Sequence, residues 1–158
     1  MKCLSTIVSL CAALFAGGCA IAPGPSPDLG AARAAAPAPA DDRLFRALGG
    51  HAGIEALSES FVRELAADEI TRAFFARTDI TRFHRLIQEQ LCAESGGGCT
   101  YTGESMRVAH AGLGIERRDM NAVVEALMRA MDKQELPIAT QNAVLALHAP
   151  KRRDVLGE

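Results

Sequence analysis

From position 41 onward, apolar residues recur at every third or fourth position, and this spacing is the feature that most restricts the fold. The pattern is strongest from Met120 to Met131, where Val123 and Leu127 continue one apolar stripe. No window alternates apolar and polar residues as a half-buried strand does. The sequence therefore predicts an all-α domain.

Glycine and proline residues divide this pattern into separate predicted helices. Asp41 and Asp42 can cap the first helix, and the glycines at 49 and 50 end it. Pro137 stands where the first turn of the last helix tolerates proline. The predicted helices cover residues 43–48, about 51–65, 80–91, 103–111, 120–131 and 137–147.

The beginning of the chain has the layout of a secretory signal. Residues 1–18 combine Lys2, an apolar stretch that ends at Phe15, and small residues just before Cys19. These small residues resemble the lipobox of bacterial lipoproteins, in which the cysteine is acylated, although Ala16 replaces the usual leucine. An ordinary signal peptide, cleaved nearby with Cys19 incidental, is the alternative. Both interpretations predict export to a bacterial cell envelope.

Residues 19–40 are rich in proline and alanine and have no helical periodicity. Such a segment cannot bury a core, so we expect it to be a tether that leads to a domain at 41–158. With Cys19 lipidated, the domain would be anchored to a membrane. We expect this to be the outer membrane, with the domain on its periplasmic side. The net charge of -2 argues against nucleic-acid binding. The basic residues at 151–153 are interpreted as a solvated tail.

Cys92 and Cys99 are the two cysteines that fall within the predicted domain. In an oxidising compartment this pair can close a short loop and contribute roughly 2 kcal/mol of stability. A zinc site is the alternative, but a Cys-x6-Cys pair without a second pair of ligands binds zinc poorly. We therefore expect a disulfide.

The sequence lacks the Ser-His-Asp, phosphate-loop, HExxH and CxxC patterns that would indicate the common enzyme or metal sites. The most suggestive residue is His110, which follows Met106 by four positions and therefore shares its face of a helix. From the residues alone, a metal-ligating histidine and a hydrogen-bonded structural histidine both remain open.

A series of separated motifs resembles the group 1 truncated haemoglobins, which are small two-over-two helical globins. The resemblance covers about residues 42–150 and implies a globin fold and a bound haem. The motifs are Gly49-Gly50-His51, Phe61, Ala73-Phe74-Phe75, Gly96-Gly97, Tyr101-Thr102-Gly103, Met106, Ala109-His110 and Gly114-Ile115.

The resemblance implies that His110 is the proximal ligand of the iron of haem b and that Phe75 packs against the porphyrin. Arg82 stands where a basic residue can meet a haem propionate, and a solvated surface arginine is the alternative. The expected haem-contacting residues are Phe61, Phe75, Arg82, Phe83, Ile87, Tyr101, Met106, His110, Ile115, Met120, Val123 and Leu127.

The chain departs from the family pattern on the opposite, ligand-binding face. Val62 replaces a usual tyrosine and Ile87 a frequent glutamine, so groups that hydrogen-bond dioxygen are absent at both places. His84 and Gln90 flank the stripe on the helix at 80–91, and either could supply a polar group or stay at the margin. The expected ligand pocket consists of Val62, Phe83, Ile87, Gln90 and Leu91.

We therefore expect a haem protein that reversibly binds a diatomic gas (O2, NO or CO) rather than an enzyme. The alternatives are NO dioxygenase or peroxidase-like activity, and a helical envelope lipoprotein without haem. The sequence identifies no redox partner. Two histidines receive no role, because His51 is expected to open a helix and His148 to lie on the surface.

Overall fold

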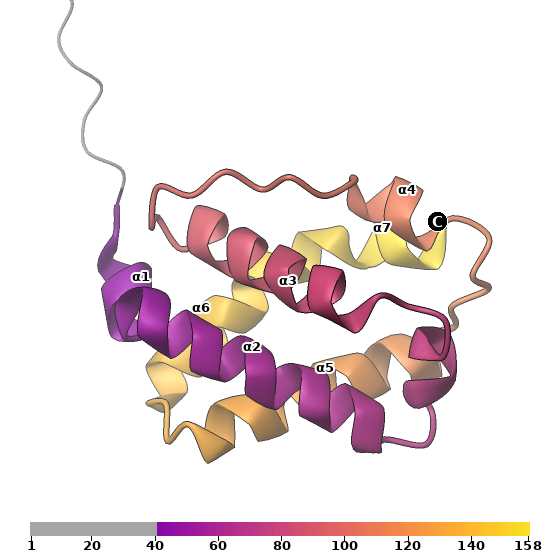
Figure 1. Cartoon of the computed structure of the whole chain (residues 1–158), viewed down its shortest axis with the longest axis horizontal. Coiled ribbons are helices and arrows are strands. Elements are labelled where there is room, and N and C mark those ends of the chain that lie inside the picture. Colours follow the sequence, from indigo (N-terminus) through magenta and orange to yellow (C-terminus); the bar gives the residue numbers. More distant parts are fainter. Residues whose placement is uncertain (1–40) are drawn as a thin grey trace, which may run out of the picture. The chain divides into compact units, whose positions relative to one another are not determined.

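The computed structural model describes residues 41–158. The predicted signal at 1–18, the tether at 19–40 and Cys19 lie outside the described residues. The described part is helical and has no strand, which confirms the all-α prediction. None of its helices is both long enough and apolar enough to cross a bilayer. The elements are α1 (Arg43–Ala47), α2 (Gly50–Ala67), η1 (Arg72–Phe75), α3 (Ile80–Glu94), α4 (Met106–His110), α5 (Arg117–Lys133), α6 (Ile138–His148), η2 (Ala149–Lys151) and α7 (Arg152–Leu156), where η marks a 3-10 helix (Figure 1).

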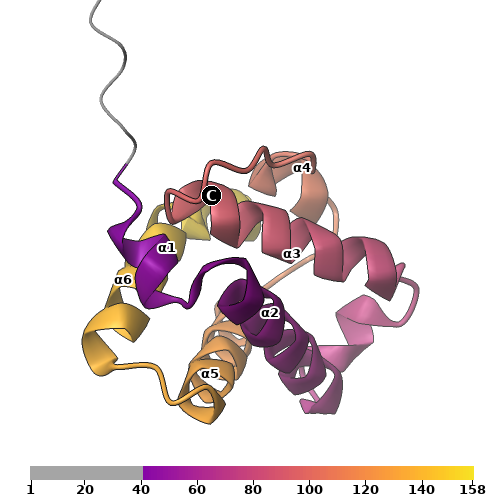
Figure 2. The same ribbon diagram turned by 60° about the vertical axis from the view of Figure 1, so that its left-hand side comes forward.

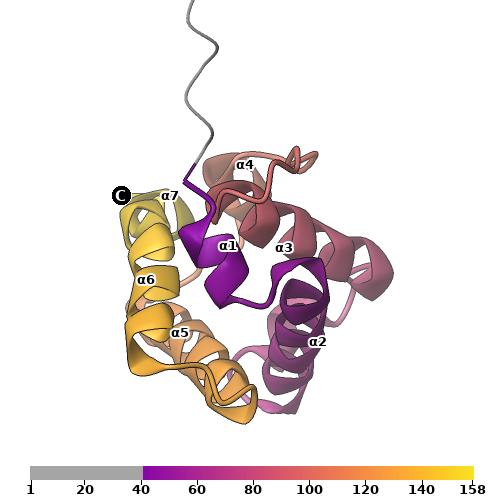
Figure 3. The same cartoon turned by 90° about the vertical axis from the view of Figure 1, so that its left-hand side faces the viewer.

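The four longest helices form two pairs. The first pair, α2 and α3, run side by side in opposite directions, and the second pair is α5 and α6 (Figure 1). Helix α2 also packs along α5, which joins the two pairs (Figure 2). The alanines Ala126 and Ala130 on α5 are fully buried, and their small side chains allow a close approach. In Figure 3 one pair lies on each side of the domain.

The turn between α1 and α2 depends on glycine. Gly49 has φ +88°, which is the left-handed region that glycine adopts without strain. A β-carbon on Gly53, one turn into α2, would clash with the carbonyl oxygen of Leu48. This close approach explains why the sequence places glycines on both sides of the helix start.

A buried carboxylate connects α2 to α5. Glu64 is only 8% exposed and accepts a 2.9 Å hydrogen bond from Nε of Arg129 and another bond from Lys133. Hydrogen bonds from Lys133 and Arg129 lower the pKa of Glu64, although burial acts in the opposite direction. The two helices are therefore joined by ionic hydrogen bonds at the edge of the core.

Cys92, near the end of α3, and Cys99, in the following loop, form a disulfide with a Cα–Cα distance of 5.6 Å. Gly96 has φ +92° and ends α3, as expected for a glycine just beyond a helix. The disulfide thus holds the three-glycine loop against the last turn of α3.

The C-terminal segment differs from the predicted solvated tail, and that prediction is wrong. Lys151 belongs to η2, the residues that follow it form α7, and α7 packs against α4 and α5 (Figure 1). Nη2 of Arg107 on α4 lies 2.5 Å from the carboxylate of Asp154 on α7. Nζ of Lys151 lies 2.5 Å from Glu94 on α3. Lys151 thus contacts α3, and Nη1 of Arg152 lies 3.4 Å from the side-chain oxygen of Asn121 on α5, whereas Arg153 is exposed.

Candidate functional site

A cavity of about 360 Å³ is enclosed chiefly by α3, α4 and α5. Its size is within the range of small-molecule and cofactor sites, and most of its lining side chains are apolar. All twelve side chains expected to contact haem line it, namely Phe61, Phe75, Arg82, Phe83, Ile87, Tyr101, Met106, His110, Ile115, Met120, Val123 and Leu127.

His110 is the last residue of α4, and its half-buried side chain lines the cavity. Its Nδ1 atom lies 2.8 Å from the carbonyl oxygen of Met106. A carbonyl oxygen only accepts hydrogen bonds, so Nδ1 carries the proton and donates it. The Nε2 atom of a neutral imidazole then keeps its lone pair, which is the arrangement found in metal-ligating histidines.

Two aromatic rings form part of the cavity wall. The ring centroids of Phe75 and Phe83 lie 4.9 Å apart, with the planes tilted by 46°. Such a tilted pair is a favourable aromatic arrangement, so each ring fixes the other. Phe75 is the last residue of η1 and Phe83 is on α3, so this contact ties η1 to the wall of the cavity.

Two of the residues expected in the ligand pocket lie outside the cavity, while Phe83, Ile87 and Gln90 line it. Phe61 and Leu65, four residues apart on α2, face the cavity, and Val62 is rotated by about 100° from Phe61. Leu91 is 2% exposed and belongs to the hydrophobic core between the helices. The expectation for Val62 and Leu91 is therefore corrected.

The polar groups near the distal wall are bonded elsewhere. Gln90 lines the cavity, but its Nε2 donates a 3.0 Å hydrogen bond to Glu94. His84 lies outside the cavity lining, with its Nε2 3.3 Å from the amide nitrogen of Gln88. The hydroxyl of Tyr101 donates to the carbonyl oxygen of Glu104 at 3.1 Å, and burial raises the pKa of Tyr101.

His148 lines the cavity and is half-buried, so the prediction that it lies on the surface is wrong. Burial lowers the pKa of His148, and the neighbouring ammonium group of Lys151 lowers it further. Nζ of Lys151 lies 3.5 Å from Nδ1 of His148 and also donates a 2.8 Å bond to the carbonyl oxygen of Leu147. Burial and the adjacent ammonium group therefore both favour the neutral form of His148.

The sequence analysis missed several residues of the cavity wall. His148, Lys151 and Val155 line the cavity at helical intervals of three and four residues. This spacing is a helical signal that could have identified them, but Pro150 and the basic residues at 151–153 favoured the prediction of a solvated tail. The other lining residues that were not predicted are Leu65, Phe74, Thr78, Asp79, Leu86, Ala109, Leu113, Asp119 and Val124.

Comparison with known proteins decides the family. The family described as "Bacterial-like globin" matches residues 43–156, which is most of the chain. The chain belongs to the bacterial-like globins. This globin is 33% identical over 118 residues to a group 1 truncated hemoglobin of Mycolicibacterium paratuberculosis, covering 75% of this chain and 84% of the relative. It is 26% identical to the group 1 truncated hemoglobin of Tetrahymena pyriformis, covering 73% of this chain and 95% of that one. The predicted resemblance to group 1 truncated haemoglobins is confirmed.

Solved structures confirm the fold of this globin. The truncated hemoglobin of Tetrahymena pyriformis in its Fe(III) form superimposes with a TM-score of 0.70 at 26% identity, covering 73% of this chain and 98% of that one. The 2/2 hemoglobin of a Synechococcus species, solved in the cyanomet state with covalently attached heme, gives a TM-score of 0.69 at 26% identity and the same coverage. The two-over-two arrangement expected from the sequence is therefore the observed fold.

Proposed function

We propose that this globin binds haem b in its cavity, with Nε2 of His110 as the proximal ligand, and reversibly binds a diatomic gas (O2, NO or CO). The observation that carries the proposal is the hydrogen bond from Nδ1 of His110, a cavity-lining residue, to Met106, which leaves the Nε2 lone pair available for a metal. When bound, haem would supply a ferrous iron that can bind a small gas molecule.

The lining of the cavity fits a flat apolar group with an anionic edge. Met120, Val123 and Leu127 present one apolar wall from α5, and the rings of Phe75 and Phe83 present another. Burial of apolar surface contributes about 25 cal/mol per Å2. Burial of a porphyrin between these walls would therefore stabilise the complex by much more than the single iron–nitrogen bond has to supply. Among the described residues Arg82 forms no ion pair, and its guanidinium can therefore meet a propionate at the rim.

The distal side chains determine which gas is held well. Phe83 and Ile87 line the cavity from α3 and offer no hydrogen-bond donor. A hydrogen-bond donor to bound dioxygen would contribute about 1.5–3 kcal/mol to binding. Its absence therefore weakens the binding of oxygen more than the binding of NO or CO. Storage of oxygen and NO dioxygenase chemistry are accordingly disfavoured relative to reversible binding of NO or CO.

We also propose that the globin domain is exported and anchored through lipid on Cys19 to the outer membrane, facing the periplasm. The support is the signal layout of the sequence and the Cys92–Cys99 disulfide, because stable disulfides are typical of oxidising compartments. The mass of the mature N-terminal peptide tests this proposal. A diacylglyceryl group on Cys19 supports it, and an unmodified peptide that begins elsewhere contradicts it.

Absorption spectra of the purified protein in ferric, ferrous and CO-bound states test the haem proposal. We expect a Soret band that shifts on reduction and shifts again with CO. A protein that is colourless as isolated and takes up no added haemin would contradict it.

A further inference from the structure

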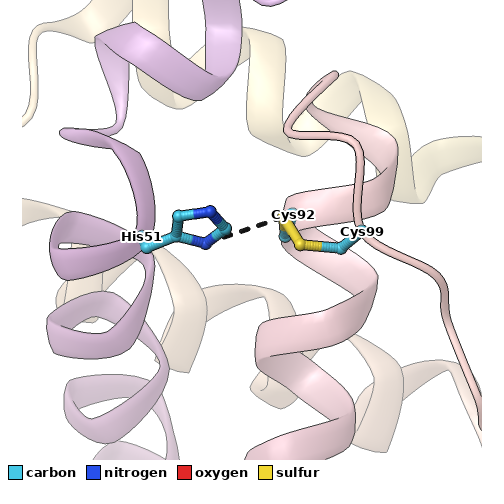
Figure 4. Close-up of side chains that lie close together, drawn as sticks. All are labelled: His51, Cys92 and Cys99. Carbon is cyan, nitrogen blue, oxygen red and sulfur yellow. Dashed lines mark hydrogen bonds between the residues drawn. A yellow bond between two sulfur atoms is a disulfide. The ribbon is translucent and has the colours of Figure 1, made fainter.

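We propose that, after reduction of its disulfide, the cluster of His51, Cys92 and Cys99 binds one cuprous ion, and that the disulfide therefore controls access to a copper site. The ligand atoms of these three side chains lie within 4.8 Å of one another. They belong to α2, to α3 and to the loop after α3 (Figure 4). None of the three residues lines the cavity proposed for haem, so this inference does not depend on haem binding.

The imidazole of His51 is already directed at the sulfur pair. Its Nδ1 lies 4.0 Å from Sγ of Cys92, and the close-up shows the ring pointing from α2 to the disulfide (Figure 4). A disulfide sulfur has no proton, so in the oxidised protein Nδ1–H donates and sulfur accepts. A metal ion with about 2.0 Å to nitrogen and 2.3 Å to sulfur needs these atoms about 3.5–3.7 Å apart. The imidazole therefore needs only a small movement. The two sulfurs, bonded to each other in the oxidised protein, must separate after reduction to about 3.8–4.0 Å for both to bind one ion.

The surroundings hold the cluster in place and leave it accessible. The ring of Phe45 lies edge-on to His51 with centroids 5.0 Å apart, which restricts the imidazole. A β-carbon on Gly97 would clash with this phenylalanine and with Sγ of Cys92, so glycine lets the loop close over the sulfur. Cys92 is buried, whereas His51 is exposed and Cys99 half-buried, which gives an ion a route from solvent.

The chemistry of the donors selects the metal. Two thiolates and one imidazole form a soft set, and soft ligands favour monovalent copper. Structural zinc takes four protein ligands, and the described residues provide three in this cluster. Reduction by a dithiol supplies two electrons and two protons: the S–S bond breaks, each sulfur gains a proton, and the reductant becomes a disulfide. Binding of Cu(I) then releases both thiol protons and forms two copper–sulfur bonds.

The test is anaerobic equilibrium dialysis of the full chain against a Cu(I)–bicinchoninate buffer with ascorbate, followed by metal counting by mass spectrometry. The chain has further cysteines outside the domain, so a Cys92→Ser/Cys99→Ser variant provides the baseline. We expect phosphine-reduced wild-type protein to hold one more copper ion per chain than this variant. Air-oxidised protein should match the baseline.

The His51→Ala variant distinguishes a three-ligand copper site from one formed by the two thiols alone. His84→Ala on α3 is the matched control. We expect His51→Ala to weaken copper binding about tenfold or more and His84→Ala to leave it unchanged. Circular dichroism should show the same helix content before and after reduction. The proposal is overturned if the reduced chain unfolds, if it binds no copper above the baseline, if zinc competes equally, or if His51→Ala binds as wild type does.

Discussion

The carbonyl oxygen of Met106 accepts a hydrogen bond from Nδ1 of His110, at 2.8 Å, within the single turn of α4. This bond fixes both the tautomer and the rotation of the imidazole before any ligand is present. Ser105 caps the same short helix by accepting a bond from the backbone nitrogen of Val108. The proximal side of the proposed haem site is therefore pre-arranged by local structure.

Replacement of Ile87 by Gln should restore a hydrogen-bond donor to the distal wall. We expect oxygen to dissociate about 10–100-fold more slowly from the variant, because a hydrogen bond to a polar ligand contributes about 1.5–3 kcal/mol. CO dissociation should change little. Stopped-flow measurement of both rates checks this, and Ile87→Met, of similar size without a donor, is the control. Equal slowing in both variants would show that pocket shape, and not a hydrogen bond, controls oxygen release.

The Glu64 contacts predict a pH dependence of stability. The pKa of Glu64 is lowered from 4.5, so its contribution is fully present above that pH and is lost as the pH falls through the lower folded value. We expect Glu64→Gln to cost about 1–3 kcal/mol at neutral pH, where it removes a charged hydrogen-bond acceptor from Arg129 and Lys133. Urea unfolding at pH 7 and at pH 3 measures this. A cost that is the same at both pH values would contradict the assignment.

His148 should make the protein less stable in mild acid. Its pKa is lowered from 6.5 by burial and then by Lys151, so the unfolded chain binds a proton that the folded chain resists. The resulting stability is present above pH 6.5 and declines as the pH falls towards the folded pKa. We expect His148→Gln to flatten the unfolding free energy below pH 6.5. His84→Gln, on α3 and outside the cavity lining, should keep the wild-type slope.

Gly53→Ala should be strongly destabilising, because its β-carbon would meet the carbonyl oxygen of Leu48. We expect a loss of roughly 2 kcal/mol or more, since backbone must move to relieve the clash. Thermal or urea unfolding measures the loss. Ala66→Ser, at an exposed position of the same helix, should change stability by about 0.5 kcal/mol at most. Equal stability of both variants would contradict the predicted clash.

The helices were predictable because their apolar spacing and their glycine stops are local signals. The apolar lining, including Met120 and Val123, followed from the same stripe on α5. The family resemblance supplied the role of His110, which residue spacing alone left open. The sequence could not predict the orientation of the His110 imidazole, because its bond to Met106 depends on a rotamer that only the packed structure fixes.

The remaining errors arise where tertiary packing outweighs local signals. Lys151 to Arg153 have the composition of a solvated tail, yet contacts with Glu94 and α4 order this segment as helix. His148 was expected on the surface because Pro150 and the basic residues at 151–153 outweighed the helical spacing of His148, Lys151 and Val155, which line the cavity together. Val62 was placed in the pocket by the family pattern and Leu91 by the apolar stripe of the helix at 80–91. The helical rotation of α2 and the core packing of α3 direct them elsewhere.

The most direct test of the central claim is the ferrous CO spectrum of His110→Gly with and without free imidazole. If Nε2 of His110 binds the iron, the variant should lose haem or the wild-type Soret band, and added imidazole should restore it. His84→Ala, tested alongside, should keep the wild-type spectrum. A His110→Gly protein whose haem content and spectrum match wild type without imidazole would contradict the account.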